Sequence, residues 1–455
     1  MIRRRMSRLL AILMVLSMLL SACAAPATDG ASAPAAAPAV DASGAPSGKL
    51  LIWVQAANQD VFEQTALDDF KQKYPDVELE FVNYPPAEVA NQMSLAIQGG
   101  VGAPDMGVTE NASIARLVEL GGLTDLSELM QPYLDDLNAP ALAEGSRDGK
   151  YYCAPWDIGP VVTFYRSDIF SQAGLSDDPA EVSALVSTWD GMLDACKTIK
   201  ETTGFNCFSL NKANNYGDYF FNMLWQQGLG LYDDEGKVVV DSPAHVATLE
   251  KLGEFWQNEV VSDELEWTDN WYAELNAPLD DPNLKPVAAI VIAAWMGNFL
   301  KTWIAADRAG DWGVAQMPAF TEGGVRSANQ GGSCMFIPEE SKNKEAAWAF
   351  IEHMLFTPEN HLKIFAYSDY FPAWEALYDD PMFEELDPYF GDEPVRMTFA
   401  EAARVIPQAN QYGPYSQAIR GAVATAVQKY ALGMATAEQA LMEAANTIRT
   451  ETGLQ

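Results

Sequence analysis

Side chains that commonly carry catalysis are few in this 455-residue chain, and their spacing fits no catalytic pattern. The chain has three histidines, His245, His353 and His361, and Pro358 prevents one helix face from holding the last two. It contains no His-Glu-x-x-His metal motif, no Gly-x-Ser-x-Gly nucleophile turn and no Gly-Lys-Ser/Thr phosphate loop. We therefore predict that the protein is not an enzyme, uses no cofactor and holds no metal.

Paired carboxylates are the one enzyme-like feature of the sequence, because glycosidases cleave with two of them. Asp233-Asp234 and Asp280-Asp281 lie beside a glycine and a proline, which are residues typical of turns. We interpret both pairs as solvated loop charges. A surface-anchored glycosidase remains the alternative from the enzyme class, and release of reducing ends from a glycan would identify it.

The N-terminal segment has the composition of an export signal. Four arginines within the first eight residues precede an apolar run over 9–20, which is short for a membrane span. Leu-Ser-Ala-Cys at 20–23 looks like a bacterial lipobox, in which Cys23 receives lipid and begins the mature chain. We expect a signal peptide over 1–22 and a lipid anchor outside the cytoplasm, on the cell surface or in the periplasm. An ordinary signal peptide with an incidental cysteine is the alternative.

The segment after Cys23 and the overall charge restrict the partners of the protein. Residues 23–48 are rich in Ala, Pro, Ser and Gly, which predicts a disordered tether. The chain has 28 Lys+Arg against 63 Asp+Glu, a formal charge of -35, and removal of the four signal arginines leaves 24 against 63, or -39. Such a surface repels phosphate groups, so we predict no nucleic-acid partner and membrane contact through the lipid anchor only.

Apolar patterns past residue 49 alternate between strand and helix, which predicts an α/β fold with open, mainly parallel sheets. The length of this part indicates two lobes. The expected strands are 49–54, 77–81, 106–108, 161–165 and 287–293. The expected helices are one started by Asp60, one through Val89, Met93 and Ile97, one through Ile114 and Leu117, then 189–200, 219–227, one after Ser341, 416–430 and one started by Thr436 with Gln439.

Four cysteines remain after Cys23, and their spacing matches no zinc site. An exported chain can keep disulfides. Cys196 and Cys207 flank a predicted helix end and the next strand, so a bridge between them is plausible. Cys153 and Cys334 form either a second pair or two buried thiols.

Several segments occur together in a characteristic order. The most specific are Gly-Lys-Tyr-Tyr-Cys-Ala-Pro-Trp-Asp at 149–157 and Thr-Phe-Tyr-Arg-Ser-Asp at 163–168. With them, the chain resembles the family 1 extracellular solute-binding proteins, the sugar receptors of ABC importers that include maltose-binding proteins. The resemblance covers nearly all of the mature chain. Its other segments are 49–54, 103–108, 288–295, 312–318, 331–332 and 347–350.

The resemblance implies a two-lobed, type II periplasmic-binding-protein-like fold with helices flanking each sheet and hinge crossovers between the lobes. Lobe 1 would comprise 49–157 plus 329–357, and lobe 2 would comprise 158–328 plus 358–455. It also implies a monomer that captures a carbohydrate, by our interpretation an oligosaccharide, in the inter-lobe cleft. Hinge closure would then present the sugar to the transmembrane permease subunits.

A sugar site needs flat aromatic rings for the C–H faces and amides or carboxylates for the hydroxyls. We expect Trp156 and Asp157 at the first crossover to do both. Asn58 and Gln59 follow the first strand, and Glu110 follows the third. These three point toward the expected cleft, although Asn58 and Gln59 are equally suited to capping a helix.

The second lobe and the crossovers supply the remaining candidates. By resemblance, Tyr216 or Trp225 covers a sugar ring, although Trp225 is equally suited to the core. Trp295 ends a buried strand at the expected cleft edge, and the glycine pair at Gly331 allows a close backbone approach. Two further stacking candidates are Tyr370 and Tyr415.

A rival ligand on the same fold is a polyamine or another cation, because carboxylates and tryptophans together also enclose ammonium groups. The sequence does not separate this receptor from a sugar receptor. Titration with oligosaccharides and with spermidine would do so.

Overall fold

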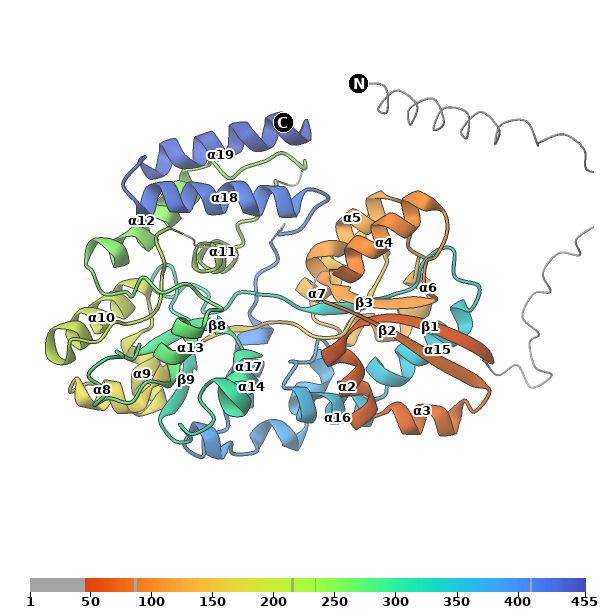
Figure 1. Ribbon diagram of the computed structural model, residues 1–455, viewed down its shortest axis with the longest axis horizontal. Coiled ribbons are helices and arrows are strands. Elements are labelled where there is room, and N and C mark those ends of the chain that lie inside the picture. Colours follow the sequence, from red (N-terminus) through yellow and green to blue (C-terminus); the bar gives the residue numbers. More distant parts are fainter. Residues whose placement is uncertain (1–45, 86–87, 214–216, 234, 410) are drawn as a thin grey trace, which may run out of the picture. The chain divides into compact units, whose positions relative to one another are not determined.

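The computed structural model describes residues 46–85, 88–213, 217–233, 235–409 and 411–455 (Figure 1). The predicted signal peptide, Cys23, most of the tether and Tyr216 lie outside these residues. The described chain is α/β, with one five-stranded, one three-stranded and one two-stranded sheet. In this part of the chain, no helix combines the length and the apolar character that crossing a membrane requires.

The first sheet has the strand order β2-β1-β3-β10-β6. Strand β1 runs parallel to β2 and β3, whereas β10 runs antiparallel to β3 and β6. A strand from late in the chain therefore lies beside β3, inside a sheet otherwise built from the first third of the chain. The bounds are β1 (Gly48–Gln55), β2 (Val77–Tyr84), β3 (Met106–Glu110), β6 (Ala154–Pro155) and β10 (Ser333–Phe336).

Helices cover both faces of the first sheet. Successive side chains of β1 point to opposite faces, so each face of the sheet carries apolar residues that pack against helices. Leu50 and Ile52 pack with one group of helices, and Trp53 packs with the other. Figure 1 shows the two groups on opposite sides of the sheet. One group is α2 (Ala56–Gln64), α3 (Leu67–Lys73), α15 (Lys344–Leu355) and α16 (Pro358–Ser368), and the other is α4 (Glu88–Gly99) and α5 (Ile114–Glu119).

The second sheet has the order β8-β7-β9, with β7 antiparallel to both neighbours. The predicted mainly parallel arrangement is therefore wrong for these strand pairs. Strand β7 carries the chain away from the first sheet, while β8 and β9 share the opposite direction on either side of it. The bounds are β7 (Val161–Arg166), β8 (Ala289–Ala293) and β9 (Trp312–Gln316).

Two apolar cores cover the two faces of this sheet. Val161 and Tyr165 of β7 belong to one core, and Val162 and Phe164 belong to the other. The first core includes α8 (Ser167–Gln172), α9 (Pro179–Leu185), α10 (Trp189–Thr203), α11 (Asp218–Trp225), α12 (Pro243–Gln257), α18 (Ser416–Ala431) and α19 (Ala437–Thr452). The second includes α13 (Asp269–Asn276), α14 (Met296–Phe299) and α17 (Val395–Arg404).

The predicted start of the last helix is confirmed. Thr436 caps α19, accepting the backbone N–H of Gln439 while the Gln439 side chain accepts that of Thr436. The predicted start at Asp60 is wrong, because α2 begins at Ala56 and Asp60 lies inside it. Short elements complete the fold: α6 (Ser127–Met130), α7 (Ala139–Glu144), β4 (Ser146–Arg147) and β5 (Lys150–Tyr151).

Stretches of chain that connect the two sheets lie side by side. Pro160 pairs with Asn329, and Asp157 pairs with Pro372, each in an antiparallel bridge. The first crossover, which includes Asp157 and Pro160, therefore lies between two others. The second crossover includes Asn329 and leads into β10, and the third passes through Pro372. Motion of one sheet relative to the other must bend these stretches together.

Both possible cysteine pairs are bonded. Cys153–Cys334 joins the segment before β6 to β10, and Cys196–Cys207 joins α10 to the segment after it. The first bond closes a separation of 181 residues and the second one of 11. The chain-entropy model assigns them about 5 and about 3 kcal/mol of stabilisation, respectively. The longer link holds β10 beside the first crossover.

Candidate functional site

A cavity of about 350 Å³ lies where the elements of the two sheets meet. This volume is within the range of small-molecule sites, and the wall combines aromatic rings with a few polar groups. The lining residues are Glu110, Ala112, Asp218, Trp225, Trp267, Trp295, Gln330, Gly331, Gly332, Tyr412, Ser416, Gln417 and Arg420.

The strand ends place two of these side chains. Glu110 is the last residue of β3, and Trp295 follows the end of β8 by two residues. Ligands of α/β sheets commonly bind beyond the carboxyl ends of the strands. The cavity lies at this position in both sheets.

The wall at the second crossover requires glycine. Gly331 and Gly332 have φ of +95° and +108°, values that L side chains rarely adopt. A Cβ on Gly332 would lie 2.8 Å from Asn111 Nδ2 and from the backbone oxygen of Asp157. A Cβ on Gly331 would lie 3.5 Å from Trp295 Nε1. The backbone therefore reaches the cavity surface without side chains.

Indole rings form the aromatic part of the wall. Trp295 Nε1 donates to the backbone oxygen of Gln330 at 3.2 Å, which fixes the ring. The centroid of the Trp267 ring lies 5.9 Å from that of Trp295, at an interplanar angle of 30°. Trp267 is 38 % exposed and has a φ of +66°. A bulky residue in this backbone region is strained, and such strain gathers at functional sites.

Arg420 forms the positively charged part of the cavity wall. Arg420 of α18 donates to Asp218 at 3.1 Å, and its guanidinium carbon lies 4.5 Å from the ring centroid of Phe221 and 5.4 Å from that of Trp225. Burial raises the pKa of Asp218 and of Glu110, and the charge of Arg420 opposes both shifts. The pair holds an acid and a cation in place over the rings.

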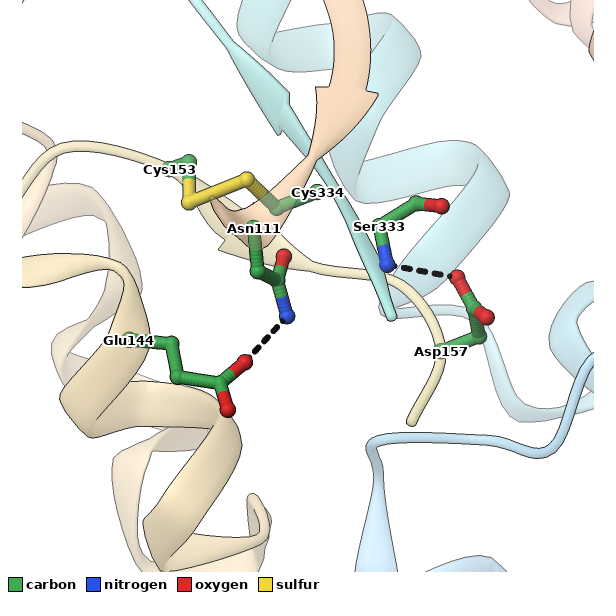
Figure 2. The surroundings of a disulfide bond; sticks show 6 residues. All are labelled: Asn111, Glu144, Cys153, Asp157, Ser333 and Cys334. Carbon is green, nitrogen blue, oxygen red and sulfur yellow. Dashed lines mark hydrogen bonds between the residues drawn. A yellow bond between two sulfur atoms is a disulfide. The ribbon is translucent and has the colours of Figure 1, made fainter. Parts of the chain in front are cut away.

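A buried polar network lies behind the glycine pair (Figure 2). Glu144 accepts from Asn111 Nδ2 at 2.8 Å and from Asn329 Nδ2 at 2.7 Å. Asp157 accepts from the backbone N–H of Ser333 at 2.9 Å. The Cys153–Cys334 bond lies beside these contacts. Burial raises the pKa of both Glu144 and Asp157 to about 7.

The structure brings four of the predicted site residues together. Glu110, Trp225, Trp295 and Gly331 all line the cavity. Trp225 belongs to the core as well, since its side chain is 1 % exposed and its ring stacks on Phe221 with a centroid separation of 5.5 Å. Trp225 therefore packs in the core and also borders the cavity, and its contact with a sugar ring stays a prediction.

The structure places Trp156 and Asp157 away from the cavity, contrary to our expectation. Trp156 is fully buried, with its ring stacked on Phe62 at 5.2 Å between centroids. Tyr370 meets the same indole edge-on at 5.6 Å between centroids and packs against the core. Asp157 is 5 % exposed and binds the backbone of β10. These residues stabilise the crossover.

The other candidates among the described residues also lie outside the cavity wall. Asn58 accepts from the backbone N–H of Gln55, which makes it part of the helix cap of α2. Gln59 donates to Glu63 at 2.6 Å on the same helix. Tyr415 is 43 % exposed at the start of α18. Tyr216 lies outside the described residues.

Sequence reasoning missed other residues of the wall. Trp267 was recognisable as an aromatic residue directly after an acidic run, which is unusual for a core position. Asp218 and Arg420 come from α11 and α18, about two hundred residues apart, so local patterns contain no signal of their pairing. Gln330 and Tyr412 likewise meet the others only in three dimensions.

The arrangement is suited to binding an uncharged, hydroxyl-rich molecule. Trp267 and Trp295 offer ring faces, and Glu110 and Gln330 offer hydrogen-bonding groups. Across the described ranges, no group of three metal-ligating side chains comes together.

Comparison with known proteins gives consistent results. The family model described as "Bacterial extracellular solute-binding protein" matches residues 65–388. The arabinooligosaccharide-binding protein of Halalkalibacterium halodurans is 25 % identical over 75 % of this chain and 75 % of its own length. The arabinooligosaccharide-binding protein of Bacillus subtilis is 24 % identical over 82 % of this chain and 79 % of its own length. The solved sugar-binding protein MalE from Xanthomonas citri covers 88 % of this chain and 96 % of its own, at 19 % identity and a TM-score of 0.73. The two-lobed α/β fold class is thereby confirmed.

The buried carboxyls behind the glycine pair predict a specific pH dependence. Glu144 and Asp157, with pKa values raised to about 7, bind protons more tightly in the folded chain than in the unfolded chain, where the pKa lies near 4. Stability should therefore fall as the pH rises from about 4 to about 7. Asp157→Asn cannot ionise and retains an acceptor for Ser333, so urea midpoints measured across this window should fall less steeply than those of the wild type.

The matched control is Asp76→Asn, at an exposed position in the turn before β2. It should leave the slope of stability against pH unchanged. An equal slope in Asp157→Asn and the wild type would contradict the assignment of the buried acid.

Proposed function

Because the chain belongs to the bacterial extracellular solute-binding protein family, we propose that its solute is a carbohydrate, captured intact in the cavity and delivered to an ABC-type permease. The observation that carries the proposal is the pair of indole rings, Trp267 and Trp295, presented in one wall beside polar groups. Similarity to arabinooligosaccharide-binding proteins supports an oligosaccharide as the ligand.

The chemistry of a sugar suits this wall. The C–H face of a sugar ring is apolar and packs on an indole, while the hydroxyl groups around it need both donors and acceptors. Glu110 offers an acceptor, and because burial raises its pKa, its protonated form is more accessible as a donor. Arg420 offers N–H groups held by Asp218. A neutral ligand leaves this ion pair intact.

Closure about the connecting stretches is the proposed means of delivery. The cavity wall includes Glu110 of β3, the glycine pair of the second crossover and side chains of helices that pack on the second sheet, so a ligand there touches the connecting chain and elements on both sides of it. A ligand that contacts both sides favours the closed state by population shift. The Cys153–Cys334 bond keeps β10 fixed to the first crossover during such a motion.

A cation such as a polyamine is the second candidate, favoured by the acids at the cavity. Glu110 and Asp218 line it, and Glu266 lies close enough to Asp218 for that charge, after burial, to raise the pKa of Glu266. Against the cation, Asp218 is already paired with Arg420, and the raised pKa values lower the negative charge that a cation would meet. Binding of a cation would release protons from these acids.

The extracellular family supports an extracytoplasmic location. We further propose that lipid on Cys23 anchors the protein to the membrane, because Leu-Ser-Ala-Cys ends an export signal and the following tether suits a surface receptor. The anchored protein works as a monomer, and the sugar and the permease are its partners in the proposal.

Isothermal titration against arabino-oligosaccharides, lactose, maltotriose and spermidine tests the ligand class. We expect Trp295→Ala to weaken the binding of the best sugar by about 1–3 kcal/mol, or roughly five- to 150-fold, because it removes a stacking face. Tyr367→Ala, at an exposed tyrosine on α16 outside the cavity wall, is the matched control and should bind as the wild type does.

Three results would overturn the carbohydrate proposal. They are equal sugar affinity in Trp295→Ala and the wild type, binding of spermidine but of no sugar, and breakdown of any sugar during the titration. Repeating the titration in buffers of different ionisation enthalpy reveals proton release, which we expect to be absent for a sugar and present for a cation.

The anchor is tested by fractionation of cells that express the full chain. The wild type should partition with membranes, and metabolic labelling with a radioactive fatty acid should mark it. Cys23→Ala should lose the label and appear in the soluble extracytoplasmic fraction or the medium. Retention of the label in Cys23→Ala would contradict lipid attachment at this cysteine.

A further inference from the structure

Six aromatic rings form a closed cycle that begins at the cavity and extends away from it. Successive centroids around the cycle are separated by 5.1, 5.4, 4.8, 5.8, 5.6 and 5.9 Å. These distances are typical of interacting aromatic pairs. In order around the cycle, the residues are Trp267, Trp271, Tyr272, Trp303, Phe299 and Trp295. We name this group the aromatic rim.

Two neighbouring helices build the aromatic rim. Trp295, Phe299 and Trp303 recur every fourth residue through α14 and the π-helix η3 (Leu300–Ile304), so they share one side. Trp271 and Tyr272 lie in the first turn of α13, directly after Trp267 and the Thr268 cap. Figure 1 shows α13 and α14 near β8. A π-helix segment is rare and is frequent at functional sites.

The rings of the aromatic rim differ in solvent exposure, so that some form a buried base and others an exposed surface. Trp271 is 1 % exposed and supports the other rings from the core. Trp267 and Trp303 are 38 % and 52 % exposed, and only Trp267 and Trp295 of the six line the cavity. Trp303 therefore presents a large apolar surface to solvent beyond the cavity, joined to it through Phe299. An exposed apolar side chain that is joined to a cavity through neighbouring rings is a candidate extension of its binding surface.

We propose that the aromatic rim binds the sugar residues of an oligosaccharide that extend out of the cavity, with Trp303 as the outer stacking platform. The inference rests on the proposed function and deepens it, because it assigns the protein a preference for longer chains. The occupant is a carbohydrate because the surface continues from the proposed sugar cavity, and the cavity volume of about 350 Å³ is near the lower limit for ligand sites.

The neighbouring side chains agree with this occupant. Asn298 and Thr302 lie next to Phe299 and Trp303 in sequence and carry uncharged polar groups. Thr302 Oγ1 donates to the backbone oxygen of Asn298 at 2.8 Å. A flat indole matches the apolar face of a sugar ring, and amide and hydroxyl groups one residue away on the same helix match its polar edge.

The test is a length series measured by isothermal titration. Arabino-oligosaccharides and malto-oligosaccharides of two to six residues are titrated into the full mature chain and into Trp303→Ala. For the wild type, we expect affinity to rise by about three- to tenfold with the residues that reach the rim. Trp303→Ala should lose this rise and bind the disaccharide within about twofold of the wild type.

Two further variants separate stacking from structural damage. Trp303→Phe keeps a smaller ring and should retain part of the rise with length. Leu432→Ala, at an exposed apolar residue that ends α18, should retain all of it. Melting temperatures of all variants should stay close to that of the wild type, because Trp303 is half exposed.

The outcomes distinguish this inference from the proposed function. Binding that does not depend on length in the wild type, or an unchanged rise with length in Trp303→Ala, overturns the inference and leaves the carbohydrate proposal in place. An unchanged rise together with loss of sugar uptake in cells assigns the surface to the permease, and this also overturns the inference. Failure of every saccharide to bind the wild type overturns the proposed function itself.

Discussion

The fold depends on a close approach between two connecting stretches of chain. At Gly332, the backbone of the second crossover packs so tightly against Asn111 and Asp157 that a Cβ would lie 2.8 Å from each. The backbone N–H of Asn111 donates to the Gly332 oxygen at 3.0 Å, and the Asp157 carboxyl receives the next N–H, that of Ser333. The disulfide between Cys153 and Cys334 holds the same strands together. The connecting stretches therefore leave the first sheet at a compact, cross-linked junction.

This junction explains the placement of the cavity and of the buried acids. Glu144 binds the amides of Asn111 and Asn329, and so joins α7 to both sides of the junction. Its buried carboxyl favours the protonated form, which makes the junction sensitive to pH. On the open side, Gly331 lies against Trp295, whose indole is held by the backbone of Gln330. One short segment thus fixes both the interior of the crossover and a wall of the ligand site.

The sequence was informative at several positions where local chemistry decides the structure, although the local pattern at Asp60 was misleading. The apolar strand β1 and the capping box at Thr436 and Gln439 follow from short patterns, and the structure contains both. The placement of Trp156 depended on α15, whose Phe350 packs against Phe62, the ring on which Trp156 stacks. That helix lies about two hundred residues away, so no local pattern indicates which way the indole points.

Packing between residues far apart in the sequence also limits what could be predicted about the candidate site. Glu110 and Trp295 were predictable because each lies at or just past the end of a strand, and strand ends gather at one edge of a sheet. Arg420 and Asp218 come from helices whose contact depends on the packing of the second core. Local patterns also could not predict the antiparallel direction of β7 in the second sheet, since that direction depends on how the chain enters β7 from the first crossover.

The central claim is that a carbohydrate ring lies against an indole of this cavity. A crystal structure of the protein grown with the saccharide that binds it most tightly tests this claim most directly. The account predicts that a sugar face lies on Trp295 or Trp267, with carbon atoms in van der Waals contact at about 4 Å. A sugar bound elsewhere on the protein, or one held in this cavity only by its hydroxyl groups with both indole faces bare, would contradict it.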